Sequence, residues 1–315
     1  MLHLQLRVPP ALLDQVVERL VADHTVTNVA VLPDAYAKPP GSLVIADVAR
    51  EGANPVVASL RALDLHHTGS IMLSEPSSIF SDAADRAEDA APGTPDDGIV
   101  WDMVENRVRK ESILSWAFIS FLTLATLLAG AGRLLDQPIL IIGAMVVGPE
   151  FSPVAAICLA LARPRLSLLP QATTTLLGGF TIAVVVSAPM WVLAHAVGLA
   201  SRAEAARGPL TDFIVQPDAW SFVIAVLAGI AGVLALTTSK SGPLVGVFIS
   251  VTTVPAVGTV GLCLGLGVWS EIPGALLQLA VNLAGMVLSG TLTLLVQRLV
   301  WARVEHAPAL ARVRG

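Results

Sequence analysis

Six long apolar stretches constrain this chain more than any other feature. They cover residues 113–132, 138–162, 173–198, 219–238, 243–269 and 273–297, and the second alone contains a charged residue, Glu150. A helix that crosses a bilayer needs about 20 mainly apolar residues, so each stretch is long enough. Six in succession leave too little polar chain between them to cover the core of a large soluble protein. We therefore predict an α-helical polytopic membrane protein with six transmembrane helices.

Charge separates the membrane part from what precedes it. The chain is 54% hydrophobic and only 14% charged, whereas soluble domains carry about 25% charged residues. Most of its charges lie before residue 112. We predict a soluble domain at residues 1–74, an acidic linker at 75–98, an interfacial helix at 99–111, the six-helix transmembrane domain at 112–297, and a basic cytosolic tail at 298–315.

Lys and Arg in the short connections predict the orientation, because they are retained on the cytoplasmic side. With the N-terminus inside, the connections on that side carry Arg107, Arg109, Lys110, Arg163, Arg165, Lys240, Arg298, Arg303, Arg312 and Arg314, and the outer ones carry Arg133, Arg202 and Arg207. The first residues lack the pattern of a secretory signal. We expect a multi-pass protein of the bacterial plasma (inner) membrane, with its N- and C-termini in the cytoplasm.

The N-terminal part alternates between strand and helix patterns. Apolar and polar residues alternate at positions 2–8, the period of a half-buried strand. Apolar positions then recur at helical spacing, followed by strands near 26–32 and 43–48, a short helix from Asn54-Pro55 and a last strand at 68–74. This order predicts a cytosolic α+β domain with the ferredoxin-like fold. Such domains are widespread among sensors, so the fold alone names no ligand.

Several kinds of chemistry are not expected. A net charge of −5 without a clustered basic face argues against a nucleic-acid partner. The two cysteines, Cys158 and Cys263, lie inside apolar stretches. His66 and His67 follow each other on a predicted strand and would point to opposite faces, so we expect no metal site and no cofactor. The spans lack the residue sets of intramembrane enzymes, so we expect no enzymatic activity.

The second and fifth apolar stretches resemble each other. The second reads GAMVVGPEFSP at residues 143–153, and the fifth reads GVFISVTTVP at 246–255. Each is the middle span of a group of three, and the two groups would enter the membrane from opposite sides. We therefore predict a 3+3 inverted repeat.

Breaks in these two stretches mark the candidate site. Pro149 and Pro153 should bend or unwind the second span, because proline removes an amide donor and clashes with the preceding turn. Paired Gly/Pro-interrupted spans in inverted halves point to the midplane site of secondary transporters, although simple proline kinks would look alike. The candidate substrate-binding residues are Gly148, Pro149, Glu150, Ser152, Pro153, Thr252, Thr253, Pro255 and Asn282.

Glu150 is the most constrained of these residues. An acidic side chain at mid-span costs roughly 3 kcal/mol even on lenient insertion scales, and it usually faces a cavity or a partner. We expect a proton-binding or cation-binding role. The alternative is a neutral carboxylic acid that hydrogen-bonds a neighbouring helix, just as Asn282 and the threonines could serve only to join helices.

The motifs IGAMVVGPEFSP at 142–153 and LVGVFISVTTVP at 244–255, with Asn282-Leu283 in the last span, resemble the bacterial membrane proteins grouped as the domain of unknown function 389 family. The resemblance covers most of residues 112–297 and implies an uncharacterised hydrophobic domain that soluble domains similar to this one often precede. Many members have a small or apolar residue where this chain has Glu150. The family implies no established activity.

Two functions follow as hypotheses. The first is a secondary transporter or channel that handles a small molecule or ion at the two breaks and is regulated by the cytosolic domain. The second is a membrane-anchored sensor that transports nothing, whose cytosolic domain binds a small metabolite or nucleotide. The lipid bilayer is the expected partner in both, and a homo-oligomer is possible in both.

Overall fold

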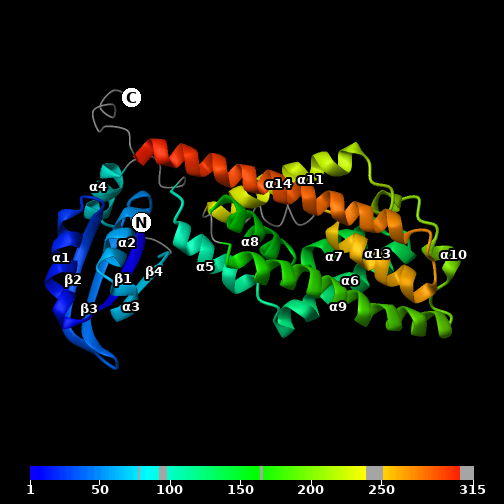
Figure 1. Ribbon diagram of the computed structural model, residues 1–315, viewed down its shortest axis with the longest axis horizontal. Coiled ribbons are helices and arrows are strands. Elements are labelled where there is room, and N and C mark those ends of the chain that lie inside the picture. The colour runs from blue at the N-terminus through cyan, green and yellow to red at the C-terminus, as the bar shows by residue number, and fades with distance from the viewer. Residues whose placement is uncertain (77–78, 92–97, 164–165, 239–250, 306–315) are drawn as a thin grey trace. The chain divides into compact units, whose positions relative to one another are not determined.

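The computed structural model describes residues 1–76, 79–91, 98–163, 166–238 and 251–305 (Figure 1). The chain divides into two compact units, one formed mainly by Met1–Val104 and the other by Glu105–Leu299. We call them the head and the helical unit. Each is described by itself.

A four-stranded antiparallel sheet forms the head. Its strands are β1 (Leu2–Val8), β2 (Val26–Ala37), β3 (Pro40–Val48) and β4 (Ser70–Ser74), in the spatial order β2-β3-β1-β4. Helix α1 (Leu13–Ala22) connects β1 to β2, and α2 (Ala53–Ala62) with the one-turn helix α3 (Leu65–Thr68) connects β3 to β4. The strand predicted at residues 2–8 coincides with β1, because its alternation reflects one buried and one half-exposed face.

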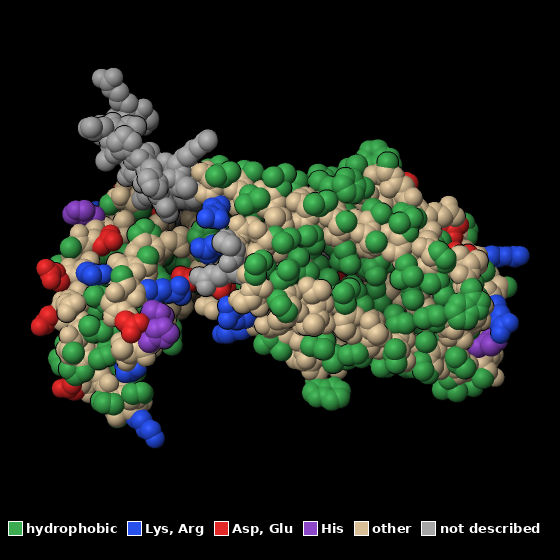
Figure 2. Space-filling model, in the orientation of Figure 1, with side chains coloured by type: hydrophobic (Ala, Val, Ile, Leu, Met, Phe, Trp, Pro, Cys, Tyr) green, Lys and Arg blue, Asp and Glu red, His purple; other side chains and the backbone are tan. Residues whose placement is uncertain are grey.

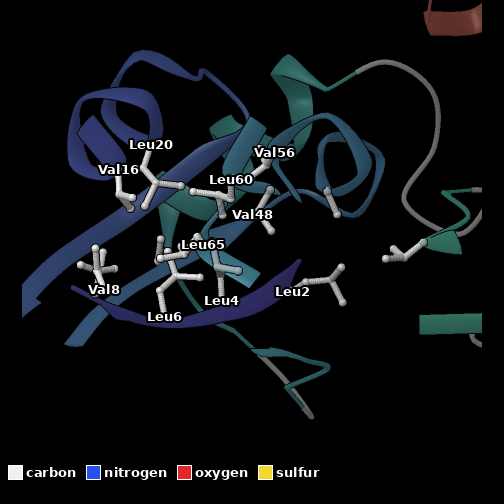
Figure 3. Close-up of a cluster of buried hydrophobic side chains, with 14 residues drawn as sticks. Leu2, Leu4, Leu6, Val8, Val16, Leu20, Val48, Val56, Leu60 and Leu65 are labelled. Atoms are coloured by element: carbon white, nitrogen blue, oxygen red, sulfur yellow. The ribbon is translucent and has the colours of Figure 1, made fainter. Parts of the chain in front are cut away.

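The core of the head lies on one face of this sheet. Leu2, Leu4, Leu6 and Val8 of β1 are fully buried and pack with apolar side chains of the helices. Figure 3 shows Val16 and Leu20 of α1 and Val56 and Leu60 of α2 directed toward this cluster. Residues three or four positions apart share one face of each helix, and every second residue shares one face of the strand. These apolar faces together form the core of the head.

One argument made from the sequence of the head is wrong. His66 and His67 were assigned to a strand, but they lie in the helical turn α3, and β4 begins only at Ser70. Asp64 precedes this turn with a left-handed backbone (φ 59°). The reason given against joint ligation by the two histidines therefore does not apply.

The acidic segment after the sheet contains helix α4 (Asp82–Ala90). It is packed rather than fully exposed, because Ala84 and Ala87, three residues apart, are buried. Glu88 lies 2.5 Å from the Met1 amino group. Helix α5 (Trp101–Glu111) follows, where the interfacial helix was predicted.

The helical unit contains four helices long and apolar enough to cross a membrane among the described residues. They are α6 (Trp116–Leu134), α9 (Leu168–Ala196), α11 (Ala219–Thr237) and α14 (Ile272–Glu305). A fifth candidate is the pair α7 (Pro138–Val147) and α8 (Phe151–Ala162), bent by 56° at its break. In Figure 2, hydrophobic side chains cover most of the face that this unit displays. The unit is therefore that of a membrane protein.

Six spans are not established by these helices. The fifth predicted stretch, 243–269, is represented by α13 (Thr253–Leu266), which has 14 residues and is shorter than a span. Residues 239–250, with the first part of the motif at 244–255, lie outside the described residues. The described residues contain four candidate spans, or up to five if the bent pair is one span.

Helix α13 lies inside the helical unit. Nearly all its side chains are buried, and it packs against α6 and α9. At Gly258, an added Cβ would lie 2.7 Å from the backbone oxygen of Thr126 on α6. Such an approach requires glycine, and it places the start of α13 deep in the unit.

Candidate functional site

The break between α7 and α8 is where the sequence predicted it. Helix α7 ends at Val147, Gly148 adopts an extended backbone (φ −68°, ψ 129°), and α8 begins at Phe151. Pro149 lies in the gap, where no helical hydrogen bond is interrupted. The second span is therefore a broken span, and its free backbone groups need partners other than lipid.

Proline is the third residue in α8, in α13 and also in α9, where it is Pro170. Pro153 is the third residue of α8, and Pro255 is the third residue of α13. Proline is tolerated in a first helical turn, because the amide it lacks has no partner there anyway. Both prolines thus mark the start of a helix. The side chains at these two helix starts can therefore contact each other.

Glu150 and Thr253 join these two helix starts. The Thr253 hydroxyl donates a hydrogen bond of 2.8 Å to Glu150 Oε1. Glu150 is 7% exposed and Thr253 is 1% exposed. A carboxylate at the beginning of two helices lies near their partial positive ends, which stabilise negative charge.

Thr252 connects α13 to α14. Its hydroxyl oxygen accepts hydrogen bonds from Gln278 Nε2 at 2.7 Å and from Asn282 Nδ2 at 2.6 Å. Gln278 and Asn282 lie four residues apart on α14, so their side chains share one face. The structure thus brings together five polar side chains, which we call the break cluster: Glu150, Thr252, Thr253, Gln278 and Asn282.

Two oxygens of the break cluster lack a hydrogen-bond partner among the described residues. They are Glu150 Oε2 and Gln278 Oε1, and both are inaccessible to solvent. Glu150 Oε2 lies over Gly148, where an added Cβ would overlap it. Buried polar atoms in native structures are nearly always satisfied, and exceptions call for an ion, a water or a functional role. Two acceptor oxygens could take a proton donor or coordinate a cation.

The remaining predicted residues are less central. Ser152 donates a hydrogen bond of 2.9 Å to Glu111 Oε2 on α5. Gly148 provides space for the carboxylate, and the three prolines shape the backbone. Within the described residues, none of these side chains forms a hydrogen bond with a side chain of the break cluster.

Gln278 is the member that the candidate list missed. Its spacing of four residues from Asn282 is the signal that could have identified it. Because α14 was predicted as a continuous span, that spacing already placed the two side chains on one face.

A second buried polar group is Arg133, which the sequence analysis treated as a charge in an outer connection. It lies at the end of α6 and is 0% exposed. Its Nη1 donates to the backbone oxygen of Gly208 at 3.2 Å, to Thr211 Oγ1 at 3.0 Å and to Asp212 Oδ1 at 2.9 Å. Nη2 lies 3.5 Å from Glu271 Oε2. This network joins α6 to the segment before α11 and to the residue before α14.

Comparisons with known proteins give a family match and one uncharacterised relative. Residues 145–288 match a family model described as a domain of unknown function, DUF389. An uncharacterized protein of Methanocaldococcus jannaschii is 27% identical over 168 residues, which are 53% of this chain and 50% of the relative. The chain thus aligns with only half the length of that relative. No solved structure matches the chain. The matched segment contains the whole break cluster, and this chain therefore carries, over residues 145–288, the domain of unknown function 389 that its two motifs predict.

Proposed function

We propose that the chain is a transport protein, either a secondary transporter or a channel, whose substrate or ion binds at the break cluster. The observation that carries this proposal is the buried carboxylate of Glu150, with one unpartnered oxygen beside a broken span. A continuous, sealed helix would not need a charge-bearing group at that position. An intramembrane carboxylate costs several kcal/mol and is retained where a cavity, a partner or an ion compensates for it.

The ligand that best fits the break cluster carries positive charge. The break cluster offers oxygen atoms from one carboxylate, two hydroxyls and two amides. Oxygen atoms of these kinds bind protons and coordinate hard cations in proteins. Among the described residues, no Lys or Arg forms a hydrogen bond or ion pair with the five side chains, so an anion would find no countercharge from them. Glu150 would act as the group that takes up the proton or cation, and the threonines and amides would fix its position.

An inverted repeat remains part of this proposal. The similar sequences at residues 143–153 and 246–255, which end in the prolines at the starts of α8 and α13, support the predicted relation between the two halves. A 3+3 arrangement with six spans requires residues 239–250 to complete the fifth. We also propose the orientation predicted from the charges, with both termini in the cytoplasm of a bacterial cell.

The head would regulate transport. Its β-α-β-β-α-β order and the strand order β2-β3-β1-β4 support assignment to the ferredoxin-like fold. Domains of this type bind regulatory ligands in many proteins, which is an argument from fold alone.

Flux measurements test the proposal. The purified chain is reconstituted into liposomes with an internal pH-sensitive dye, and proton uptake is measured under an imposed potential, then with Na⁺ or K⁺ gradients. We expect wild-type flux for a proton or one of these cations, and its loss in Glu150→Gln. Glu204→Gln, an exposed glutamate of the same unit, serves as the matched control and should retain flux.

The contrary results are equally specific. Equal flux in wild type and Glu150→Gln would remove the break cluster from the pathway. Absence of flux for every ion tested, together with ligand-induced stabilisation that requires the head, would favour the membrane-anchored sensor instead.

A further inference from the structure

We infer that the head carries a binding site for a divalent transition-metal ion at Asp64, His66 and His67. This site lies outside the break cluster and does not depend on transport. The three residues each offer one ligand atom, and these atoms lie within 4.8 Å of one another. All three side chains are exposed, so an ion has access to them.

The backbone of this turn is held in place by the rest of the head. Leu65, between the first and second ligands, is fully buried in the hydrophobic core. The Asp64 carbonyl accepts hydrogen bonds from the amides of His67 and Thr68, each at 3.1 Å, and from the Thr68 hydroxyl at 3.0 Å. The three ligand side chains therefore extend from a fixed turn, so that only side-chain freedom is lost when an ion binds.

Close packing behind the turn prevents it from moving away. The amide of Gly69 donates to the carbonyl of Leu65 at 2.8 Å. A Cβ added at Gly69 would overlap the backbone oxygen of Arg7 on β1 and meet the Leu65 backbone oxygen at 3.0 Å. The end of α3 thus lies directly on the sheet.

The separation of the ligand atoms fits one ion. Nitrogen and oxygen ligands lie about 2.0–2.2 Å from Zn²⁺, so two ligands of one tetrahedral ion are about 3.4 Å apart. Atoms within 4.8 Å of one another reach that separation by small rotations of exposed side chains. The two imidazole rings are already adjacent, with centroids 4.0 Å apart and ring planes inclined by 42°.

Ligand chemistry selects the class of metal. Two imidazoles and one carboxylate suit Zn²⁺, Ni²⁺, Co²⁺ or Cu²⁺, whereas Mg²⁺ and Ca²⁺ prefer oxygen ligands. Three protein ligands leave at least one coordination position for water or another group, as in open zinc sites. An exposed site of this kind can load and release its metal from solution.

Zinc titration tests the site. The full chain, purified in detergent without a polyhistidine tag, is titrated with zinc chloride in competition with a chromophoric chelator. We expect one Zn²⁺ per chain at the tightest site. His66→Ala and His67→Ala should each weaken this binding by at least about tenfold, since each removes one of three ligands. Asp64→Asn should weaken it too, and asparagine tolerates the left-handed backbone that position 64 requires.

Matched controls make the result decisive. His24→Ala replaces another exposed histidine of the head and should leave zinc binding unchanged. A tenfold excess of Mg²⁺ should not displace the zinc. If the double variant His66→Ala/His67→Ala binds zinc as tightly as the wild type, or if Mg²⁺ displaces it, the site is not the one described here and the inference is overturned.

Discussion

Thr253 and Glu150, 103 residues apart in the chain, share a buried hydrogen bond of 2.8 Å between the starts of two helices. This bond supplies the partner that Glu150 Oε1 needs, whereas Oε2 has none among the described residues. The pair thus links the second predicted span to the fifth. Its energetics decide how rigidly the break cluster is held.

Replacing Thr253 by valine should destabilise the helical unit. Valine keeps the shape but removes the donor, and a buried acceptor that loses its partner costs about 1–3 kcal/mol. Thermal unfolding in detergent measures the loss. Thr253→Ser keeps the hydroxyl and should cost less. In the background of Glu150→Gln the effect of Thr253→Val should change, because contacting residues are coupled. Strictly additive effects would mean that the bond contributes nothing.

Gly148→Ala should also disturb Glu150, by a steric clash rather than by the loss of a hydrogen bond. An added Cβ would overlap Glu150 Oε2 and lie 2.6 Å from Val254 Cγ2. Overpacking of this kind costs about 1–3 kcal/mol, so we expect a lower unfolding temperature and an altered ion response.

Gly143→Ala is the matched control for this substitution. Gly143 lies on α7, five residues before Gly148, and nothing is within 4 Å of a Cβ added there. Since alanine is the better helix former, the variant should be as stable as the wild type or slightly more stable. Equal effects of the two substitutions would contradict the packing described at Gly148.

The sequence predicted those features that depend on local periodicity or on proline. Strand β1 followed from alternation at residues 2–8, and the break after α7 followed from Pro149 and Pro153. The length of β2 did not, because Pro33 and the exposed residues after it carry no apolar alternation and the register shifts between Leu32 and Tyr36. The exposed end of this hairpin has no buried face, so its sequence lacks the alternation from which a strand is predicted.

Contacts between residues far apart in the sequence were harder to predict. The candidate list contained Glu150, Thr253 and Asn282, but periodicity alone could not say that the first two bond each other. The burial of Arg133 was not predicted, for a related reason. A charge at the end of an apolar stretch looks like a connection, whereas here the carbonyl of Gly208 and the side chains of Thr211 and Asp212 enclose it, from more than seventy residues away.

Arg133→Leu should cost more stability than most substitutions in the helical unit. The guanidinium is 0% exposed, and its loss leaves Thr211, Asp212 and a backbone carbonyl without their donor. Breaking a buried ion pair costs about 3–5 kcal/mol, and the loss here should lie at or below the lower end, since Asp212 is 41% exposed and water replaces part of the interaction.

Arg202→Leu provides the comparison for Arg133→Leu, because Arg202 is an exposed arginine of the same unit. Surface substitutions usually change stability by no more than about 0.5 kcal/mol. Denaturant unfolding of both variants in the same detergent measures the difference. Similar losses for the two arginines would show that the Arg133 network adds no stability.

Glu51 in the head predicts a pH dependence with a defined sign. It is 4% exposed, and neither carboxylate oxygen has a hydrogen-bond partner among the described residues. Burial raises the pKa of Glu51 above its usual 4.5. The folded head therefore binds this proton more tightly than the unfolded chain does. Its contribution to stability is complete below pH 4.5 and is lost as the pH rises through the raised pKa.

Glu51→Gln removes the charge and keeps the shape, so the variant should be more stable than the wild type at pH 7. The difference should shrink as the pH falls and vanish well below pH 4.5, where the wild-type carboxyl is protonated in both the folded and the unfolded state. Protection of β1 amides in hydrogen exchange, corrected for intrinsic rates, reports the stability of the head within the full chain. Glu18→Gln, on the exposed side of α1, controls for the loss of a surface glutamate. A wild type that is more stable than Glu51→Gln at pH 7 would mean that the carboxylate is ionised and paired in the folded head, because only a compensated charge could stabilise that position.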